Sequence, residues 1–332
     1  MVVEHFPQSV CSLISRTQNW NGNVLYANQI ASLSIFAFIC VDLWFSPHAS
    51  ADQPNILWII TDDQRADSIA AFNRILRDNP DSGLGQVMSP NVDRLAKMGT
   101  TFINTFNQNP CCAPSRTLMH TGRYSHRTGV YGFEYYNPIG QAHWKPMVPE
   151  ILRDRAGYQT LAVGKMGIYA RHYSTHKEGT EPPLYQTNLG YRKEFAAKGL
   201  VDWNKEVQWT NGKKGPTTER FNFASGEQLL WPDSPDASPN HRAEIQARLN
   251  LLRQYKPGDN DKSSGGILAG QNPQTGDRTR DGNFTSALLE HLANGGKEYT
   301  DALGRRQTGP AEDKPLFAYI GFEFPHTPVL PP

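Results

Sequence analysis

Two adjacent carboxylates, Asp62 and Asp63, follow an apolar run in which residues 55–60 read NILWII. A run without alternation is typical of a strand buried on both faces of a parallel sheet. Ligands of open α/β sheets bind outside the carboxyl ends of such strands. Two carboxylates at that edge suit a hard divalent cation with oxygen ligands. In the alternative interpretation, one of the two simply caps the next helix.

Cys112, Pro114 and Arg116 form a second group with chemical potential. Proline favours the first turn of a helix, so Cys112 is predicted to lie at or just before a helix N-terminus. The backbone amides and the helix dipole there favour an anion or an oxyanion. Arg116 lies one turn further along the same face and can reach that anion. The alternatives are a small buried cysteine, or a bridge to Cys111 that would be strained.

The elements that must position these residues alternate between strand and helix along the chain. Helices are predicted at residues 68–76, with Asp67 as the cap, and at 92–98, 114–120 and 148–155; strands are predicted at 55–60, 100–106, 158–163 and 316–322. Such alternation predicts the α/β class, with a doubly wound, mostly parallel sheet and helices on both faces.

Residues 174–282 break this alternation. They are rich in Gly, Pro, Asn, Lys and Thr, and only short helical stretches are predicted among them, such as residues 241–255. A structureless stretch of this length is unusual in a compact domain. We therefore expect a loop-rich insertion over the active-site face, or a partly disordered segment.

Four stretches carry a more specific pattern: NILWIITDDQRAD, MSPNVDRLAKMGTTFINTFNQNPCCAPSRTLMHTGRYSHRTGVYG, GYQTLAVGKM and KPLFAYIGFEFPHTP. They cover most of residues 55–166 and return at 314–328. In this order and spacing they resemble the type I sulfatases of the alkaline phosphatase superfamily. The resemblance implies an alkaline phosphatase-like fold and hydrolysis of a sulfuric ester.

The resemblance also implies that a cysteine becomes the nucleophile after oxidation to formylglycine. Here that residue is Cys112, because Cys111 lacks the Pro and Arg downstream. The hydrated aldehyde attacks sulfur through one hydroxyl and uses the other to expel sulfate. One calcium ion, held by Asp62, Asp63 and residue 112, is expected to orient the hydrate and polarise the sulfate oxygens. A formylglycine-generating or sulfatase-maturing enzyme is then a required partner.

Three further side chains have roles implied by the resemblance. Arg116 is expected to stabilise the hydrated aldehyde, and Lys165 to contact the sulfate as a point charge. His326 is expected to protonate the leaving alcohol oxygen. Outside this family context, Lys165 reads as a surface lysine after a strand and His326 as a buried, hydrogen-bonded histidine.

The chain departs from the family pattern at two positions near these residues. Gly167 stands where the family usually has a histidine, two positions after Lys165. His172 is the candidate replacement, provided that its loop folds back. His120 stands where an apolar residue is usual.

The chain stops at Pro332, shortly after the His326 segment. Sulfatases continue with further metal ligands, another lysine and a smaller C-terminal domain. We therefore expect residues 52–332 to form an incomplete, truncated catalytic domain that lacks the C-terminal part of the family. Calcium prefers six to eight oxygens, more than Asp62, Asp63 and residue 112 provide. An exposed sheet edge is expected as well.

An export signal is predicted at the N-terminus. Residues 30–41 are apolar, and Ala-Ser-Ala follows at 49–51. This pattern is typical of a signal peptide and too short to span a bilayer comfortably. Residues 1–51 are thus interpreted as a signal peptide or N-terminal anchor, and the protein as exported to the periplasm or outside the cell. The alternatives are a mis-assigned start and a buried element of the domain.

Composition excludes several classes of protein. With 33 Lys plus Arg and 32 Asp plus Glu, the net charge is +1, whereas binding many phosphates needs a basic excess. Nucleic acid is therefore not an expected partner. Hydrophobic residues at 38% can form a core, and four Cys are too few for a disulfide scaffold. Gly and Pro are about 16% of the chain, which favours loops over a helical bundle.

The sequence favours a sulfuric ester hydrolase acting on a sulfated carbohydrate or an aryl sulfate. The first alternative is an inactive remnant, or a protein that binds sulfated glycan without turnover. The second is a related phosphatase or phosphonate hydrolase with a similar nucleophile. Residues 174–282 carry no motif that selects one ester.

Overall fold

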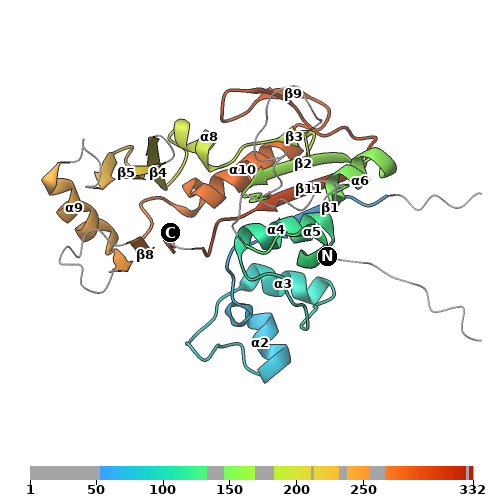
Figure 1. Ribbon diagram of the computed structural model, residues 1–332, viewed down its shortest axis with the longest axis horizontal. Coiled ribbons are helices and arrows are strands. Elements are labelled where there is room, and N and C mark those ends of the chain that lie inside the picture. The colour runs from blue at the N-terminus through green and yellow to red at the C-terminus, as the bar shows by residue number, and fades with distance from the viewer. Residues whose placement is uncertain are drawn as a thin grey trace, which may run out of the picture.

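A parallel sheet forms the centre of the structure, a computed structural model that describes residues 53–132, 146–168, 183–210, 213–231, 238–254, 266–326 and 329–331. Its strands lie in the order β1-β11-β2-β3, and each neighbouring pair is parallel. Their bounds are β1 Ile56–Ile60, β11 Leu316–Gly321, β2 Gln159–Gly164 and β3 Thr187–Asn188. The prediction of an α/β fold with a mostly parallel sheet is confirmed (Figure 1).

Helices cover both faces of the sheet. Alternate residues of β11 point to opposite faces, so Phe317 and Tyr319 join one core cluster and Ala318 and Ile320 the other. The first cluster packs against α6 (Val148–Ala156), and the second contains side chains of α8 (Arg192–Ala197) and α10 (Arg280–Ala293). The sheet is therefore doubly wound.

The expectation that the first strand is buried on both faces is wrong. Trp58 packs into the core, but Leu57 and Ile59 on the other face are 54% and 46% exposed. β1 is the edge strand of the described sheet, and α10 packs over β11 and β2, the next two strands in the sheet. An apolar run does not distinguish an edge strand from a central one, because that distinction depends on which helices reach it.

The segment between β1 and β2 holds η1 (Ala66–Ser68), α2 (Ala70–Arg77), α3 (Pro90–Met98), α4 (Cys112–Thr121) and α5 (Ser125–Thr128). Asp67 does not cap α2; its carboxylate accepts hydrogen bonds from the Arg65 guanidinium at 3.0 and 2.7 Å. The strand expected at residues 100–106 is also wrong, since this described stretch is irregular. Strand propensity is expressed only where a neighbouring strand is present to pair with.

The insertion is more ordered than its composition suggests. β4 (Trp203–Thr210), β5 (Lys213–Asn222) and β6 (Gln228–Trp231) form an antiparallel sheet, followed by α9 (Pro239–Leu249), the β7 (Leu252–Gln254) and β8 (Gly266–Ala269) pair, and η3 (Gly276–Arg278). β4, β5, β6, α9 and β8 contribute to one core that includes Trp203, Phe221, Trp231 and Ile245. The labels β4, β5, α9 and β8 lie together at the left of Figure 1. α9 ends at Leu249 because Asn250 adopts a left-handed conformation (φ 45°). The β9 (Glu298–Thr300) and β10 (Arg306–Thr308) hairpin precedes β11.

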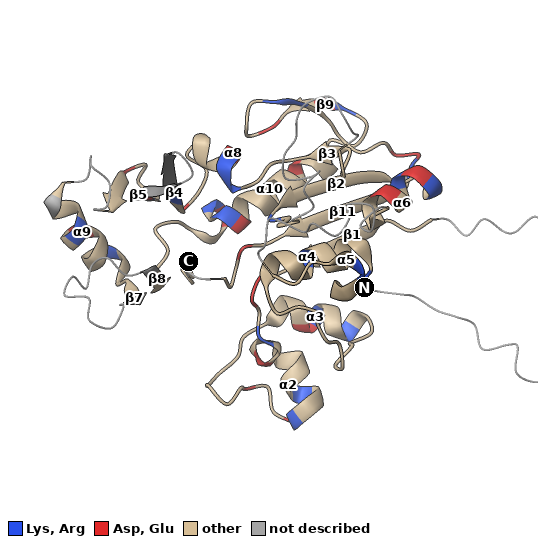
Figure 2. Ribbon diagram, in the orientation of Figure 1, with Lys and Arg blue, Asp and Glu red and all other residues tan. Residues whose placement is uncertain are grey.

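Two sequence predictions fall outside the described residues. They are the signal peptide or N-terminal anchor at 1–51, and His172 as the replacement for the histidine that the family usually has at position 167. None of the helices in the described ranges is long and apolar enough to cross a bilayer. Both α3 and α6 carry acidic as well as basic side chains (Figure 2).

His120, in the last turn of α4, is buried in an aromatic cluster. Its ring centroid lies 5.0 Å from that of Trp58 and 5.1 Å from that of Tyr319. Its two ring nitrogens meet the Arg116 carbonyl at 2.7 Å and the Tyr185 hydroxyl at 2.9 Å. Burial lowers the pKa of His120 to about 4. The histidine therefore acts as a neutral part of the core.

This burial predicts an acid-sensitive contribution to stability. Because the folded pKa lies below the usual 6.5, the neutral ring contributes fully above pH 6.5, and the contribution is lost as the pH falls toward 4. His120→Leu is expected to be less stable than wild type at pH 8. The difference in the free energy of unfolding between the two proteins should narrow by about 2 kcal/mol at pH 5. Urea unfolding at both pH values measures this. An unchanged difference between His120→Leu and wild type at the two pH values would contradict the prediction.

Candidate active site

Asp62, directly after β1, is the anionic centre of the site. It is 3% exposed, and its carboxylate contacts the Lys165 ammonium and, at 3.3 Å, the Arg116 guanidinium. The Asp62 amide also donates to the Phe324 carbonyl at 3.3 Å. A buried carboxylate is tolerated because it is paired in this way. Asp62 therefore connects the end of β1 to α4, to the end of β2 and to the loop after β11.

Arg116 is 1% exposed and binds the ends of the central strands. One guanidinium nitrogen donates to the Lys165 carbonyl at 2.5 Å and to the Tyr319 hydroxyl at 2.6 Å. The other donates to the Phe322 carbonyl at 3.3 Å, besides its contact with Asp62. Tyr319 in turn donates to the Lys165 carbonyl at 2.8 Å, and burial raises its pKa to about 12, so the phenol stays protonated.

Two glycines permit this close packing. Gly164 ends β2 at φ +79°, and a Cβ atom there would collide with the Gly321 carbonyl at the end of β11. Gly167, the position where a histidine was expected, has φ +57°, and a Cβ atom there would lie 3.1 Å from Cδ of Arg116. A left-handed backbone strains any residue with a side chain. The glycine at 167 therefore fits the buried arginine beside it.

Cys112 begins α4, as predicted, and Cys111 is the N-cap residue. Both are free thiols of intermediate exposure. Two asparagines that the sequence analysis missed order the preceding loop. Asn109 accepts from the Cys111 amide at 3.0 Å, and Asn107 donates to the Ser115 hydroxyl at 2.5 Å. The signal for this was the Asn-x-Asn pattern before a helix, since short polar side chains bond nearby backbone in turns.

A cavity of about 390 Å³ lies between β1 and the start of α4. Its polar lining comprises Thr61, Asp62, Asp63, Gln64, Asn107, Cys111, Cys112, Ser115 and Arg116. The Lys165 ammonium contacts the carboxylate of Asp62, which lines this cavity, and Nε2 of His326 lies 3.7 Å from Oδ2 of Asp63. Six predicted site residues thus lie near the carboxyl ends of β1, β2 and β11, namely Asp62, Asp63, Cys112, Arg116, Lys165 and His326. Their chemical roles stay predictions.

The calcium site is incomplete in this set of residues. Among the described residues, no group of three or more His, Cys, Asp or Glu could hold a metal ion. Asp62 is already paired with two cations, and Asp63 is half exposed with φ 57°. Calcium prefers six to eight oxygen ligands. The described residues alone therefore do not fit this ion.

A protein-family model described as Sulfatase matches residues 54–332. The chain belongs to the sulfatase family. The mostly parallel sheet, with helices on both faces, agrees with the alkaline phosphatase-like fold that the sequence resemblance implied.

Curated relatives carry sulfatase names. Iduronate 2-sulfatase of Mus musculus is 31% identical over 156 residues, 46% of this chain and 26% of that protein. N-acetylgalactosamine-6-sulfatase of Homo sapiens is 32% identical over 153 residues, 43% of this chain and 25% of that protein. Arylsulfatase K of Bos taurus is 25% identical over 209 residues, 57% of this chain and 35% of that protein. The matched part of this sulfatase chain spans about a quarter to a third of these relatives.

The two neighbouring carboxylates are expected to differ in their effect on stability. Asp62→Asn leaves Lys165 and the buried Arg116 without their anion and should lower the free energy of unfolding by about 3 kcal/mol. Asp63→Asn, at a half-exposed position, should cost less than about 1 kcal/mol. Denaturant unfolding of both variants measures the difference, and equal losses would contradict the role of Asp62 as the buried counterion.

The fit between Gly167 and Arg116 has a matched control in Gly122. Both glycines have a left-handed backbone, with φ +57° and +62°, but a Cβ atom at Gly122 meets nothing within 4 Å. Gly122→Ala should therefore cost only the conformational strain of about 1 kcal/mol. Gly167→Ala should cost about 1 kcal/mol more, because Arg116 must move. Thermal or urea unfolding compares the two, and identical losses would show that Arg116 does not restrict position 167.

Proposed function

We propose that this sulfatase chain provides the nucleophile and anion-binding residues for hydrolysis of a sulfate ester. The main support is the cavity that Asp62, Asp63, Cys112 and Arg116 line together. Cys112 lies in the first turn of α4, where backbone amides have no acceptor within the helix and favour an anion. A partly exposed thiol beside this cavity is accessible to a maturing enzyme that converts it to formylglycine.

Formylglycine at position 112 supplies, as its hydrate, the oxygen that attacks sulfur. Around it we assign different roles to the two cations. Lys165 is the more exposed, with 16% of its side chain accessible against 2% for Arg116. Lys165 contacts the sulfate oxygens as a point charge. Arg116, whose donors bind protein groups, holds Asp62 and the strand ends in place.

His326 is the proposed proton donor to the leaving oxygen. It lies on the loop after β11, and its Nε2 atom is 3.7 Å from Asp63. A carboxylate at this distance can hold the imidazole in one orientation for such a step. Asp63 is thus proposed to orient His326. The described residues do not complete a calcium site, and each role assigned above belongs to a side chain of this chain.

The substrate class and the location are part of the same proposal. Two of the relatives are named for sulfatase action on iduronate and on N-acetylgalactosamine, which supports a sulfated carbohydrate; an aryl sulfate is the simplest test substrate. The apolar run at residues 30–41 followed by Ala-Ser-Ala at 49–51 supports export.

The decisive substitution is Cys112→Ala, with Cys111→Ala as its matched control. Protein made together with a formylglycine-generating enzyme should carry an aldehyde in the peptide that contains Cys112, as mass spectrometry can show. It should also hydrolyse an aryl sulfate. Cys112→Ala should lower kcat/KM at least roughly 10³-fold, because the nucleophile is lost, whereas Cys111→Ala should retain both the aldehyde and turnover.

Two results would contradict the proposal. An intact thiol at Cys112 after co-production, with no turnover of aryl sulfate, would favour a protein that binds sulfated glycan without catalysis. Faster turnover of the matched aryl phosphate than of the aryl sulfate would favour a phosphatase.

A further inference from the structure

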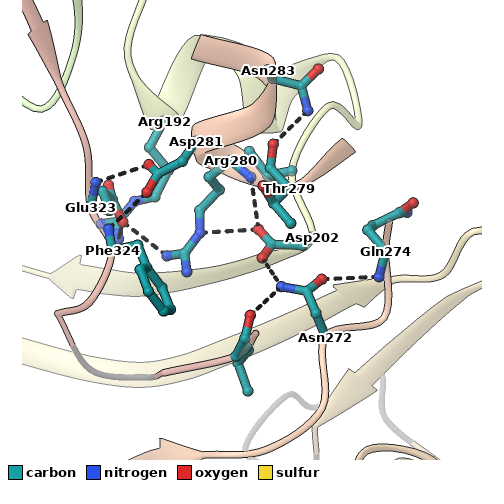
Figure 3. Close-up of polar contacts among 12 residues, drawn as sticks. Arg192, Asp202, Asn272, Gln274, Thr279, Arg280, Asp281, Asn283, Glu323 and Phe324 are labelled. Carbon is teal, nitrogen blue, oxygen red and sulfur yellow. Dashed lines mark hydrogen bonds and ion pairs between the residues drawn. The ribbon is translucent and has the colours of Figure 1, made fainter. Parts of the chain in front are cut away.

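The loop that carries His326 is held from the opposite face of the sheet by the first turn of α10. Thr279 is the N-cap of this helix and accepts from the Gly282 amide. The next two residues, Arg280 and Asp281, both reach across to the segment that follows β11 (Figure 3). The mechanism proposed above uses neither of them.

Asp281 binds the loop backbone at two adjacent amides. Its Oδ1 accepts from the Glu323 amide at 2.9 Å, and its Oδ2 accepts from the Phe324 amide at 2.8 Å. Each carboxylate oxygen thus has one backbone donor (Figure 3). Burial raises the pKa of Asp281, so these two bonds offset part of the cost of placing a carboxylate there.

Arg280 holds the side chain of the same loop residue. Its guanidinium donates to Oε2 of Glu323 at 2.8 Å and to Oδ1 of Asp202 at 3.0 Å. Glu323 is therefore bound through its backbone by Asp281 and through its carboxylate by Arg280. Asp202 lies just before β4 of the insertion and also accepts from Asn272 at 2.7 Å. The same helical turn thus connects the insertion to the loop.

The backbone of the held segment leads directly to the proposed proton donor. The Glu323 carbonyl accepts from the His326 amide at 2.9 Å, and the Phe324 carbonyl accepts from the Asp62 amide at 3.3 Å. The amides of residues 323 and 324 therefore donate to Asp281, and their carbonyls accept from the His326 and Asp62 amides. A shift of this segment would move His326 relative to Asp62 and Asp63.

We propose that Asp281 is a positioning residue for His326: by fixing the amides of Glu323 and Phe324, it sets where the imidazole stands relative to Asp63, which lines the cavity with Cys112. This inference rests on the proposed function, in which His326 gives its proton to the leaving oxygen. A second cavity, of about 330 Å³, lies beside the loop and is lined by Asp281, Phe324 and His326. Asp281 thus lies on the α10 side of the loop, and the cavity with Cys112 lies on the α4 side.

The direct test compares Asp281→Asn with Asp277→Asn in the full chain. An asparagine presents an NH₂ group to one of the two loop amides, so that hydrogen bond cannot form. Asp277 is exposed and its carboxylate accepts from the nearby Thr275 hydroxyl, so it serves as the control. Hydrogen exchange of peptides across residues 321–326 should be roughly tenfold faster in Asp281→Asn and unchanged in Asp277→Asn. Unchanged exchange in both variants overturns the proposal.

A kinetic ratio then distinguishes positioning from simple loss of fold. A general acid matters more for a basic leaving group, so phenyl sulfate should need His326 more than 4-nitrophenyl sulfate does. Asp281→Asn is expected to lower the phenyl to 4-nitrophenyl ratio of kcat roughly tenfold, in the same direction as His326→Ala. Misfolding reduces the active fraction equally for both substrates and leaves this ratio unchanged. Asp281→Glu, which keeps two acceptors, should recover part of the ratio.

The outcomes separate the two proposals. If aldehyde-bearing wild type hydrolyses neither ester, the proposed function fails, and the exchange experiment alone decides whether Asp281 holds the loop. If wild type is active and Asp281→Asn lowers both rates equally, the positioning role is overturned and the proposed function stands. In the double variant Asp281→Asn/His326→Ala, the ratio should fall no further than in His326→Ala alone.

Discussion

The Arg116 guanidinium is 1% exposed, and a buried cation is tolerated only when its charge and its donors are matched. Its partners come from the three longer strands of the central parallel sheet: Asp62 after β1, Tyr319 on β11 and the Lys165 carbonyl after β2. A single side chain of α4 therefore holds three strand ends at fixed separations. Since Cys112 begins the same helix, the position of the candidate nucleophile depends on this one arrangement.

The burial of Arg116 explains which residue types surround it. A strand end that delivers its carbonyl to a guanidinium must turn sharply, which explains the left-handed glycines at 164 and 167. Tyr319 completes the coordination by accepting from Arg116 and donating to the Lys165 carbonyl. A histidine at 167 would need a strained backbone and would press on Cδ of Arg116. The departure from the family pattern is thus compatible with an intact core, although it removes an imidazole from that position.

Local patterns predicted β1, β2, β11 and the start of α4 well, because apolar runs and a first-turn proline act within a few residues. The edge position of β1 and the order of the insertion were not predictable in this way, since both depend on contacts between distant segments, as in the core shared by Trp203 and Ile245. At the site, Asp62, Cys112 and Arg116 were found from spacing and resemblance. Tyr319 and Asp281 were not found, because Tyr319 binds a backbone carbonyl 154 residues away and Asp281 binds backbone amides 42 and 43 residues away.

The two helices that begin at this edge of the sheet, α4 and α10, differ in whether acidic groups lie near the positive N-terminal end of the helix dipole. The first turn of α10 carries Asp281, and the Arg280 amide donates to Asp202 at 3.2 Å, so carboxylates already balance the dipole there. The first turn of α4 is Cys112-Ala113-Pro114-Ser115, which carries no acidic residue. The nearby charge of Asp62 is matched by Lys165 and Arg116. An anion at this edge is therefore favoured at the start of α4, beside Cys112, more than at the start of α10.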